Sequence, residues 1–253
     1  MKKTIFMSAL ISLLILVSVG ACGLLQEPES ASAPIEATPL ATEVVEPTSP
    51  EDVVQTEVVE VEAEGEGNVE TSAPGEARTF SISQAESEVR FELDEDLRGQ
   101  RTTVVGITDQ VAGEIRVDMA DLSTAQVGVM QINARTLLTD NSFRNRAIQN
   151  EILETGEFEF ITFEPVAIEG LPESVGVGEE ITFNIAGDLT IRDITQSIVF
   201  SVVAKVDSEN QISGTATAII ERVDFDLNIP SVPNVANVEE EVELYIDFVA
   251  IAG

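Results

Sequence analysis

The clearest hydrophobic pattern in the chain lies between residues 181 and 191, ITFNIAGDLTI. Every second residue from Ile181 to Ile191 is apolar or glycine, and the positions between them are mostly polar. Successive side chains on a strand point to opposite faces, so this alternation predicts a β-strand with one apolar face. Such a strand needs an apolar surface to pack on, which implies a sheet folded around a hydrophobic interior.

Further segments alternate in the same way. The expected strands are 78–83, 87–93, 103–108, 111–118, 126–134, 160–168, 197–206, 211–222 and 242–250. Pro165 predicts a bulge or an edge, because proline cannot donate a backbone hydrogen bond. Tight turns are expected at Arg192-Asp193 and at 207–210.

One segment has helical spacing instead. Apolar residues recur at helical intervals over 143–153, and residues 139–142 offer side chains that can cap a helix N-terminus. About eight strands with one short helix predict an all-β fold, an antiparallel up-and-down or meander barrel.

The N-terminus has the layout of a secretory signal over residues 1–21. Lys2 and Lys3 precede an apolar run, and small residues lead to Cys22. The segment 19–22, VGAC, resembles the lipobox of bacterial lipoproteins, which implies cleavage before Cys22 and its lipidation. The alternative is an ordinary secretory signal with an incidental cysteine. Cys22 is the only cysteine of the chain, so no internal disulfide can form.

Residues 22–76 differ in composition from the domain that follows at 77–253. They are rich in Glu, Pro, Ser, Thr and Ala, and no Lys or Arg occurs between Lys3 and Arg78. Like charges repel and proline blocks regular structure, so we expect a disordered acidic tether. Its expected role is to hold the domain away from the membrane, and the alternative is a tail that captures a basic partner or cations.

Charge and composition exclude several functions. The formal net charge of −33 argues against nucleic acid and against direct attraction to an anionic membrane surface. The chain has no histidine, so an ordinary catalytic triad and imidazole metal ligands are absent. No glycine-rich phosphate loop or G-x-S-x-G element occurs, so we expect no enzyme and no cofactor. The acidic clusters 94–96 and 239–241 lack the spacing of a calcium loop and are expected to be solvated.

Short motifs spread over the domain match one family in order and spacing. They are SEVRF at 87–91, RTLLTDN at 135–141 followed by Arg144, ITF at 161–163, GDLTI at 187–191 followed by Thr195, RVDF at 222–225, and PSVP at 230–233 followed by Val238-Glu239. On these residues the segment 79–252 resembles the YceI-like family of secreted and periplasmic proteins. The resemblance implies a lipocalin-like, extended antiparallel barrel around a long apolar pocket, which holds a polyisoprenoid or similar amphiphile in family members. The chain departs from the family in lacking its histidines and in carrying Asp193 and Asp226 where glycines are usual.

The candidate binding residues are the apolar side chains expected to face inward. They are Phe91, Met130, Phe163, Phe183, Ile185, Leu189, Phe200, Val202 and Phe248. With the resemblance they form a pocket wall, and without it they form a filled core. The small residues Gly128, Gly187, Gly214, Ala216 and Ala218 are compatible with a void or with close packing.

Several arginines are candidates for polar roles. Arg101 and Arg192 lie in expected loops, where they can contact a ligand head group at the barrel mouth. Arg222 is expected to pair with Asp224 or to brace a turn, and Arg144 and Arg146 are expected to be solvated on the helix.

Two classes of function follow. The first is a membrane-anchored extracytoplasmic protein of the cell envelope that sequesters or carries an isoprenoid or similar lipid. The second is an envelope interaction or stress module with a filled barrel and a protein partner. The sequence leaves open whether the chain is a homodimer.

Overall fold

The alternating segment forms the long strand β9 (Glu180–Ile191), whose apolar side chains face the inside of a barrel. Ile185, Gly187, Leu189 and Ile191 are buried, and the residues that alternate with them are partly exposed. The computed structural model describes residues 26–40 and 76–253. The expected signal segment 1–21, the lipidation site Cys22 and residues 41–75 lie outside the described residues.

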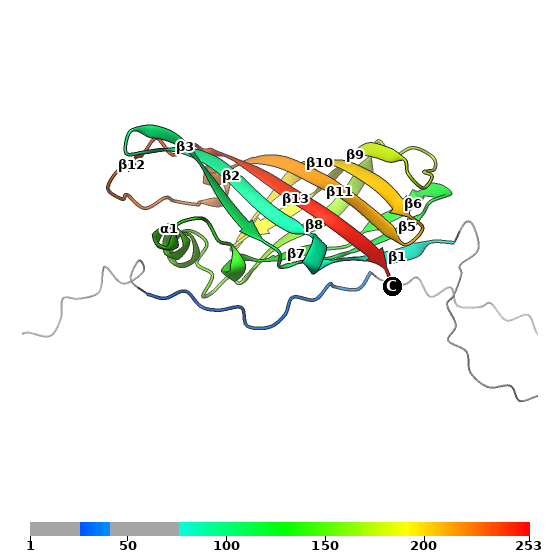
Figure 1. Ribbon diagram of the computed structural model, residues 1–253, viewed down its shortest axis with the longest axis horizontal. Helices are drawn as coiled ribbons and strands as arrows, with labels where there is room; N and C mark the ends of the chain where they lie inside the picture. Colours follow the sequence, from blue (N-terminus) through cyan, green and yellow to red (C-terminus); the bar gives the residue numbers. More distant parts are fainter. Residues whose placement is uncertain (1–25, 41–75) are drawn as a thin grey trace, which may run out of the picture.

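The remaining elements follow the expected strand pattern closely (Figure 1). The other strands are β1 (Arg78–Ile82), β2 (Glu88–Leu97), β3 (Gln100–Thr108), β4 (Val111–Ala112), β5 (Glu114–Asp118), β6 (Asp121–Val127), β7 (Met130–Asn133), β8 (Phe160–Glu169), β10 (Ile194–Ser208), β11 (Gln211–Glu221), β12 (Val235–Ala236) and β13 (Glu241–Ala252). The helical elements are α1 (Ser142–Ala147), the π-helical turn η4 (Ile148–Ile152) and the 3-10 turns η2 (Gln84–Glu86), η3 (Ala134–Thr136) and η5 (Arg222–Phe225).

The strands close into an elongated antiparallel barrel. Their order is β4-β7-β8-β9-β10-β11-β13-β1-β5-β6. β4 is one end of this order and β5 is next to the other end, and only Gly113 separates the two strands, so the covalent chain closes the order. On its other side, β13 pairs first with β2 and then, toward its C-terminal end, with β1. The expected all-β antiparallel barrel with one short helix is therefore confirmed.

Two local expectations are also confirmed. Asn141 caps α1, because its side chain accepts hydrogen bonds from the backbone N–H groups of Phe143 and Arg144. The pairing of β8 with β9 shifts register between Pro165 and Ala167, which is the expected bulge.

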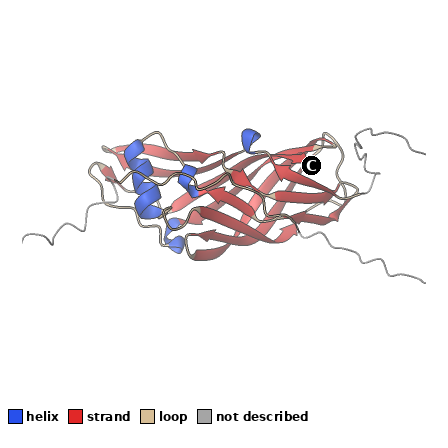
Figure 2. Cartoon of the chain, turned by 90° about the horizontal axis from the view of Figure 1, so that it is seen from below, coloured by secondary structure: helices blue, strands red, loops and turns tan. Residues whose placement is uncertain are grey.

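The expected helix over 143–153 continues past α1 as a π-helical turn. Leu153 N donates to Ile148 O, the wider spacing of a π-helix. The buried side chain of Gln149 donates to the backbone carbonyls of Arg135 and Leu137, and these bonds fasten the turn to η3. The turn lies with α1 at one end of the barrel (Figure 2).

The expectation of a disordered tether over 22–76 is wrong for residues 26–40. This segment runs extended along the outside of the barrel (blue in Figure 1). Ile35 is 4% exposed, and Ser32 bonds to Glu159. The acidic composition hides this docking, because the hydrogen-bond partners lie between 49 and 127 residues away in the sequence. Within residues 26–40 and 76–253, no helix has the length and hydrophobicity needed to cross a membrane.

Candidate functional site

The barrel interior contains two apolar cavities that follow one another along its length. The smaller cavity measures about 120 Å³ and lies toward the end opposite α1, between the β8–β11 strands and β13. All the side chains that line it are apolar, and none of them is exposed. It adjoins a surface depression lined by residues within 120–127 and 165–173, with which it shares Leu122, Val127 and Ile168.

The larger cavity measures about 400 Å³ and lies beside α1. Its walls come from β2, β3, β13, α1, η4 and the segment 227–238. Five of its lining residues are exposed, namely Arg98, Asn141, Phe143, Pro233 and Asn234. The cavity therefore reaches the surface between α1, the β2–β3 turn and the segment 227–238. We call the place bounded by these five residues the opening.

A partial layer of side chains lies between the two cavities. Along β9, Ile191 lines the larger cavity and Ile185 lines the smaller one, while the buried Leu189 between them lines neither. On β11, Ala218 occupies the corresponding place between Ala216 and Ile220. On β8 and β13 the linings follow one another directly. The interior is therefore partly divided, whereas the family resemblance implies one long pocket.

Most of the predicted wall residues meet at the smaller cavity. The predicted residues that line the smaller cavity are Met130, Phe163, Phe183, Ile185, Phe200, Val202 and Phe248. Phe91 lines the larger cavity, and Leu189 belongs to the dividing layer. The rings of Phe163 and Phe200 meet edge to face, with centroids 5.0 Å apart, next to this layer.

The glycines allow aromatic rings to pack closely against the backbone of the neighbouring strand. A Cβ on Gly106 would lie 2.2 Å from the Phe91 ring, and a Cβ on Gly187 would lie 2.6 Å from the Phe163 ring. Each ring therefore covers a glycine on the neighbouring strand. The aromatic side chains fill volume that the glycines leave open, which limits both cavities.

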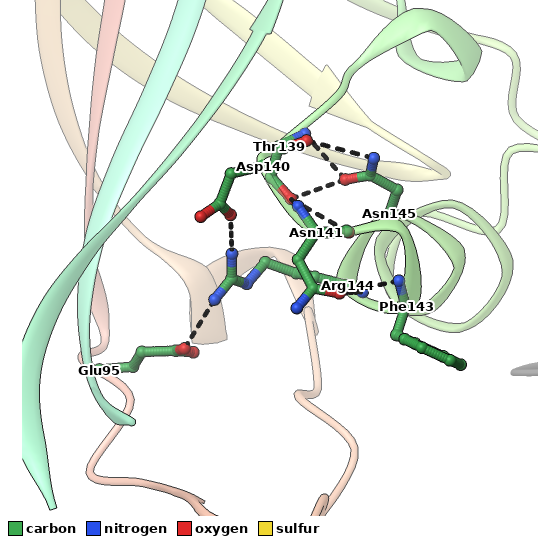
Figure 3. A network of polar contacts seen from close by, with 7 residues as sticks. All are labelled: Glu95, Thr139, Asp140, Asn141, Phe143, Arg144 and Asn145. Atoms are coloured by element: carbon green, nitrogen blue, oxygen red, sulfur yellow. Dashed lines mark hydrogen bonds and ion pairs between the residues drawn. The ribbon is translucent and has the colours of Figure 1, made fainter. Parts of the chain in front are cut away.

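An ion pair crosses the wall of the larger cavity. Arg144 Nη2 on α1 donates to Glu95 Oε1 on β2 at 2.9 Å, and its Nη1 donates to Asp140 Oδ1 at 2.6 Å (Figure 3). Glu95 is 6% exposed, so little water reaches its carboxylate and Arg144 is its ion-pair partner. Thr139 and Asn145 bond to each other beside the pair and fix the start of α1. The expectation that Arg144 is merely solvated is wrong.

Arg222 also lines the larger cavity, as a brace. It donates to the backbone carbonyls of Leu227 and Glu239 and pairs with the Glu240 carboxylate at 2.9 Å. The expected ion pair with Asp224 does not form among the described residues. The alternative expectation, a turn brace, is confirmed.

The two predicted head-group residues lie elsewhere. Arg101 pairs with Asp94, Asp96 and Glu239, so part of each acidic cluster is engaged by one arginine rather than solvated. Arg192, in a left-handed conformation with φ of 57°, donates to the Ile152 carbonyl and pairs with Glu154. Neither residue lines either cavity.

Arg98 is a residue of the opening that the sequence reasoning missed. It is exposed at the β2–β3 turn, with a left-handed φ of 54°. In the described part of the chain, its guanidinium has no ion-pair partner, which distinguishes it from Arg144 and Arg222. The charged turn before Gly99 is the sequence signal that could have indicated it.

The arrangement offers an apolar volume with a charged rim. Residues 26–40 and 76–253 contain no group of three metal-ligating side chains placed to hold a metal ion. The site can therefore enclose an apolar chain and face a polar group at the opening with Arg98.

Comparisons with known proteins agree with this architecture. The model of the YceI-like domain matches residues 80–250. The fold is similar to that of a polyisoprenoid-binding domain from Saccharophagus degradans, with a TM-score of 0.56, 14% sequence identity, and coverage of 69% of this chain and 98% of that one. It is also similar to Burkholderia cenocepacia BcnA, with a TM-score of 0.53, 16% identity, and coverage of 66% and 98%. No curated protein matches the chain in sequence.

Proposed function

The chain belongs to the YceI-like family, and from this we propose that it is a membrane-anchored binding protein outside the cytoplasm. Its cargo is an isoprenoid or similar amphiphilic lipid, held in the barrel.

The observation that carries the proposal is the open larger cavity. Its volume of about 400 Å³ falls within the range of about 300–1,000 Å³ that is usual for small-molecule sites. Its walls are mainly aliphatic, and its opening carries the exposed Arg98 and the amides of Asn141 and Asn234. An apolar chain inside and a polar head at the opening would satisfy both parts of this site.

Two further observations support the proposal. The S. degradans domain of similar fold is a polyisoprenoid-binding domain. The sequence VGAC at 19–22 resembles a lipobox, and lipidation of Cys22 would attach the chain to a membrane after export.

The test is native mass spectrometry of the chain from Cys22 to Gly253, purified without detergent, with organic extraction of any adduct. Wild type is compared with Val104→Phe, which puts a ring into the larger cavity, and with Val202→Phe, which makes the same change at the smaller one. We expect an adduct of isoprenoid mass on wild type and on Val202→Phe, and its loss from Val104→Phe.

Two results would contradict the proposal. The first is a wild-type chain that stays unbound after incubation with polyprenyl and quinone lipids, which would favour an envelope interaction module. The second is equal lipid occupancy in both variants, which would remove the larger cavity as the site. Thermal unfolding of each variant checks that the barrel still folds.

A further inference from the structure

The docked segment 26–40, which we call the strap, is tied to the barrel by polar contacts in its first half. Asn150 Nδ2 on η4 donates to Gln26 O at 2.9 Å. Glu29 pairs with Arg135 at 3.0 Å. Ser32 donates through its backbone N–H and its hydroxyl to Glu159, at 2.8 and 2.6 Å.

The barrel residues that bind the strap also contact one another. The side chains of Arg135 and Glu159 are each only 10% exposed, and they pair with each other at 3.2 Å. Asn133 donates to the same Glu159 carboxylate at 2.9 Å. The strap therefore joins a buried polar network that the barrel already holds in place.

The second half of the strap is held by an apolar contact and two hydrogen bonds. Ile35 is 4% exposed, and its carbonyl accepts from Gln84 Nε2 at 2.8 Å. Leu40 N donates to Glu114 on β5 at 2.9 Å. The strap thus begins beside η4, at the end of the barrel with the opening, and ends beside β5 (Figure 1).

The strap begins a few residues after the expected lipid anchor in the sequence. Cys22 stands four residues before Gln26, and four extended residues span about 14 Å. Without docking, the chain from Cys22 to Arg78 would act as a flexible tether with an end-to-end distance of about 40 Å.

We propose that the docked strap holds the opening of the larger cavity at the surface of the membrane that carries Cys22. The proposal rests on the proposed function, because it takes Cys22 as the lipid anchor. Its consequence is a domain oriented for exchange of an amphiphile with the bilayer, in place of a domain that turns freely on a long tether.

The surface at this end suits a lipid interface. Phe143 is 65% exposed on α1 and borders the opening. Arg98, at the turn between β2 and β3, adds an exposed positive charge and borders the same opening. An aromatic ring and a cation are groups that settle at a bilayer surface. Both border the opening of a chain whose net charge of −33 would otherwise keep it from an anionic surface.

The test couples the chain from Cys22 to Gly253, which contains every described residue, to a maleimide lipid in vesicles through its single thiol. The chain has no tryptophan, so Phe143→Trp or Val177→Trp places one fluorophore near the opening or at the opposite end. Energy transfer to dansyl lipid in zwitterionic vesicles then reports which end faces the bilayer. Ile35→Asp and, separately, Ser32→Ala remove strap contacts. Thr38→Asp adds the same charge as Ile35→Asp at an exposed strap position and is the control.

We expect strong transfer from the Phe143→Trp chain, weak transfer from the Val177→Trp chain, and loss of this difference when either strap variant is added. Thr38→Asp should keep the difference. Equal transfer from both ends, or a difference that survives both strap variants, would overturn the proposal.

Lipid occupancy, measured by mass spectrometry on the same chains, separates the two proposals. A chain that binds no lipid yet shows strap-dependent orientation would refute the carrier function and support the strap. A chain that binds lipid but shows equal energy transfer from both ends would support the carrier function and refute the strap proposal. Chemical coupling makes the orientation test independent of native lipidation.

Discussion

Arg144 on α1 and Glu95 on β2 form an ion pair with a nitrogen–oxygen distance of 2.9 Å, and this pair fastens the helix over the larger cavity. The side chain of Arg144 is 19% exposed and that of Glu95 is 8% exposed. The Glu95 carboxylate is the more buried of the two charges, so water replaces its partner poorly when Arg144 is lost.

Replacement of Arg144 by alanine should therefore destabilise the fold. The change leaves Glu95 buried without its counter-ion, and breaking such a pair costs about 3–5 kcal/mol. The free energy of unfolding from urea titration measures the effect. The matched control is Asp140→Asn, which removes the other carboxylate partner of Arg144. Because Asp140 is 87% exposed, its loss should cost no more than about 1 kcal/mol. Equal losses in the two variants would contradict this account.

A methyl group at Gly106 should disturb the larger cavity. A glycine-to-alanine change in an unstrained strand usually stabilises by about 0.4–1 kcal/mol, but here the Cβ would lie 2.2 Å from the Phe91 ring. We expect Gly106→Ala to lower the unfolding temperature and to reduce lipid occupancy, since the ring must move within the cavity. Adding Phe91→Leu should restore stability. Failure of the second change to restore it would show that the clash lies elsewhere.

The layer between the cavities should set the length of the bound chain. Leu189 is 3% exposed and lines neither cavity. Leu189→Ala should cost about 2–5 kcal/mol and join the two spaces. We expect the extracted lipid to shift toward longer chains, as measured by mass spectrometry. The control Leu153→Ala widens the larger cavity without joining it to the smaller one. A lipid profile that is the same in wild type and Leu189→Ala would argue against this role of the layer.

The sequence predicts the parts of the fold that depend on local pattern. Alternation identifies β9, the side chain of Asn141 identifies the start of α1, and Pro165 identifies the bulge in β8. The same alternation selects the inward face, and for this reason eight of the nine predicted wall residues line one of the two cavities.

The sequence does not predict features that depend on register between strands. Leu189 and Ala218 lie between the linings of the two cavities, and alternation alone does not show where along β9 and β11 one cavity ends and the other begins. Phe91 fills space because β2 pairs it directly with Gly106. The docked strap is hidden for a related reason. Acidic, proline-rich composition predicts disorder, and the partners Arg135 and Glu159 are far away in the sequence.

Glu159 makes strap docking sensitive to acid. Burial opposes ionisation of its carboxyl group, but the hydrogen bonds from the Ser32 hydroxyl and backbone N–H and from Asn133, together with the charge of Arg135, lower the pKa of Glu159 below its ordinary 4.5. Release of the strap removes both Ser32 bonds, and each of these bonds lowers the pKa of Glu159. The docked state therefore favours the ionised carboxylate.

Acidification should consequently release the strap. The contribution of Glu159 to docking is present while its carboxyl group is ionised and is lost as the pH falls through the lowered pKa of the docked state. The NMR signal of the Ser32 backbone amide measures this, because that N–H donates to the carboxylate at 2.8 Å. We expect the signal to move toward its undocked position as the pH falls below 4.5. Glu159→Gln, which cannot ionise, should weaken docking at neutral pH and abolish this part of the titration. A Ser32 signal that titrates identically in wild type and Glu159→Gln would refute the assignment of the acid response to this carboxylate.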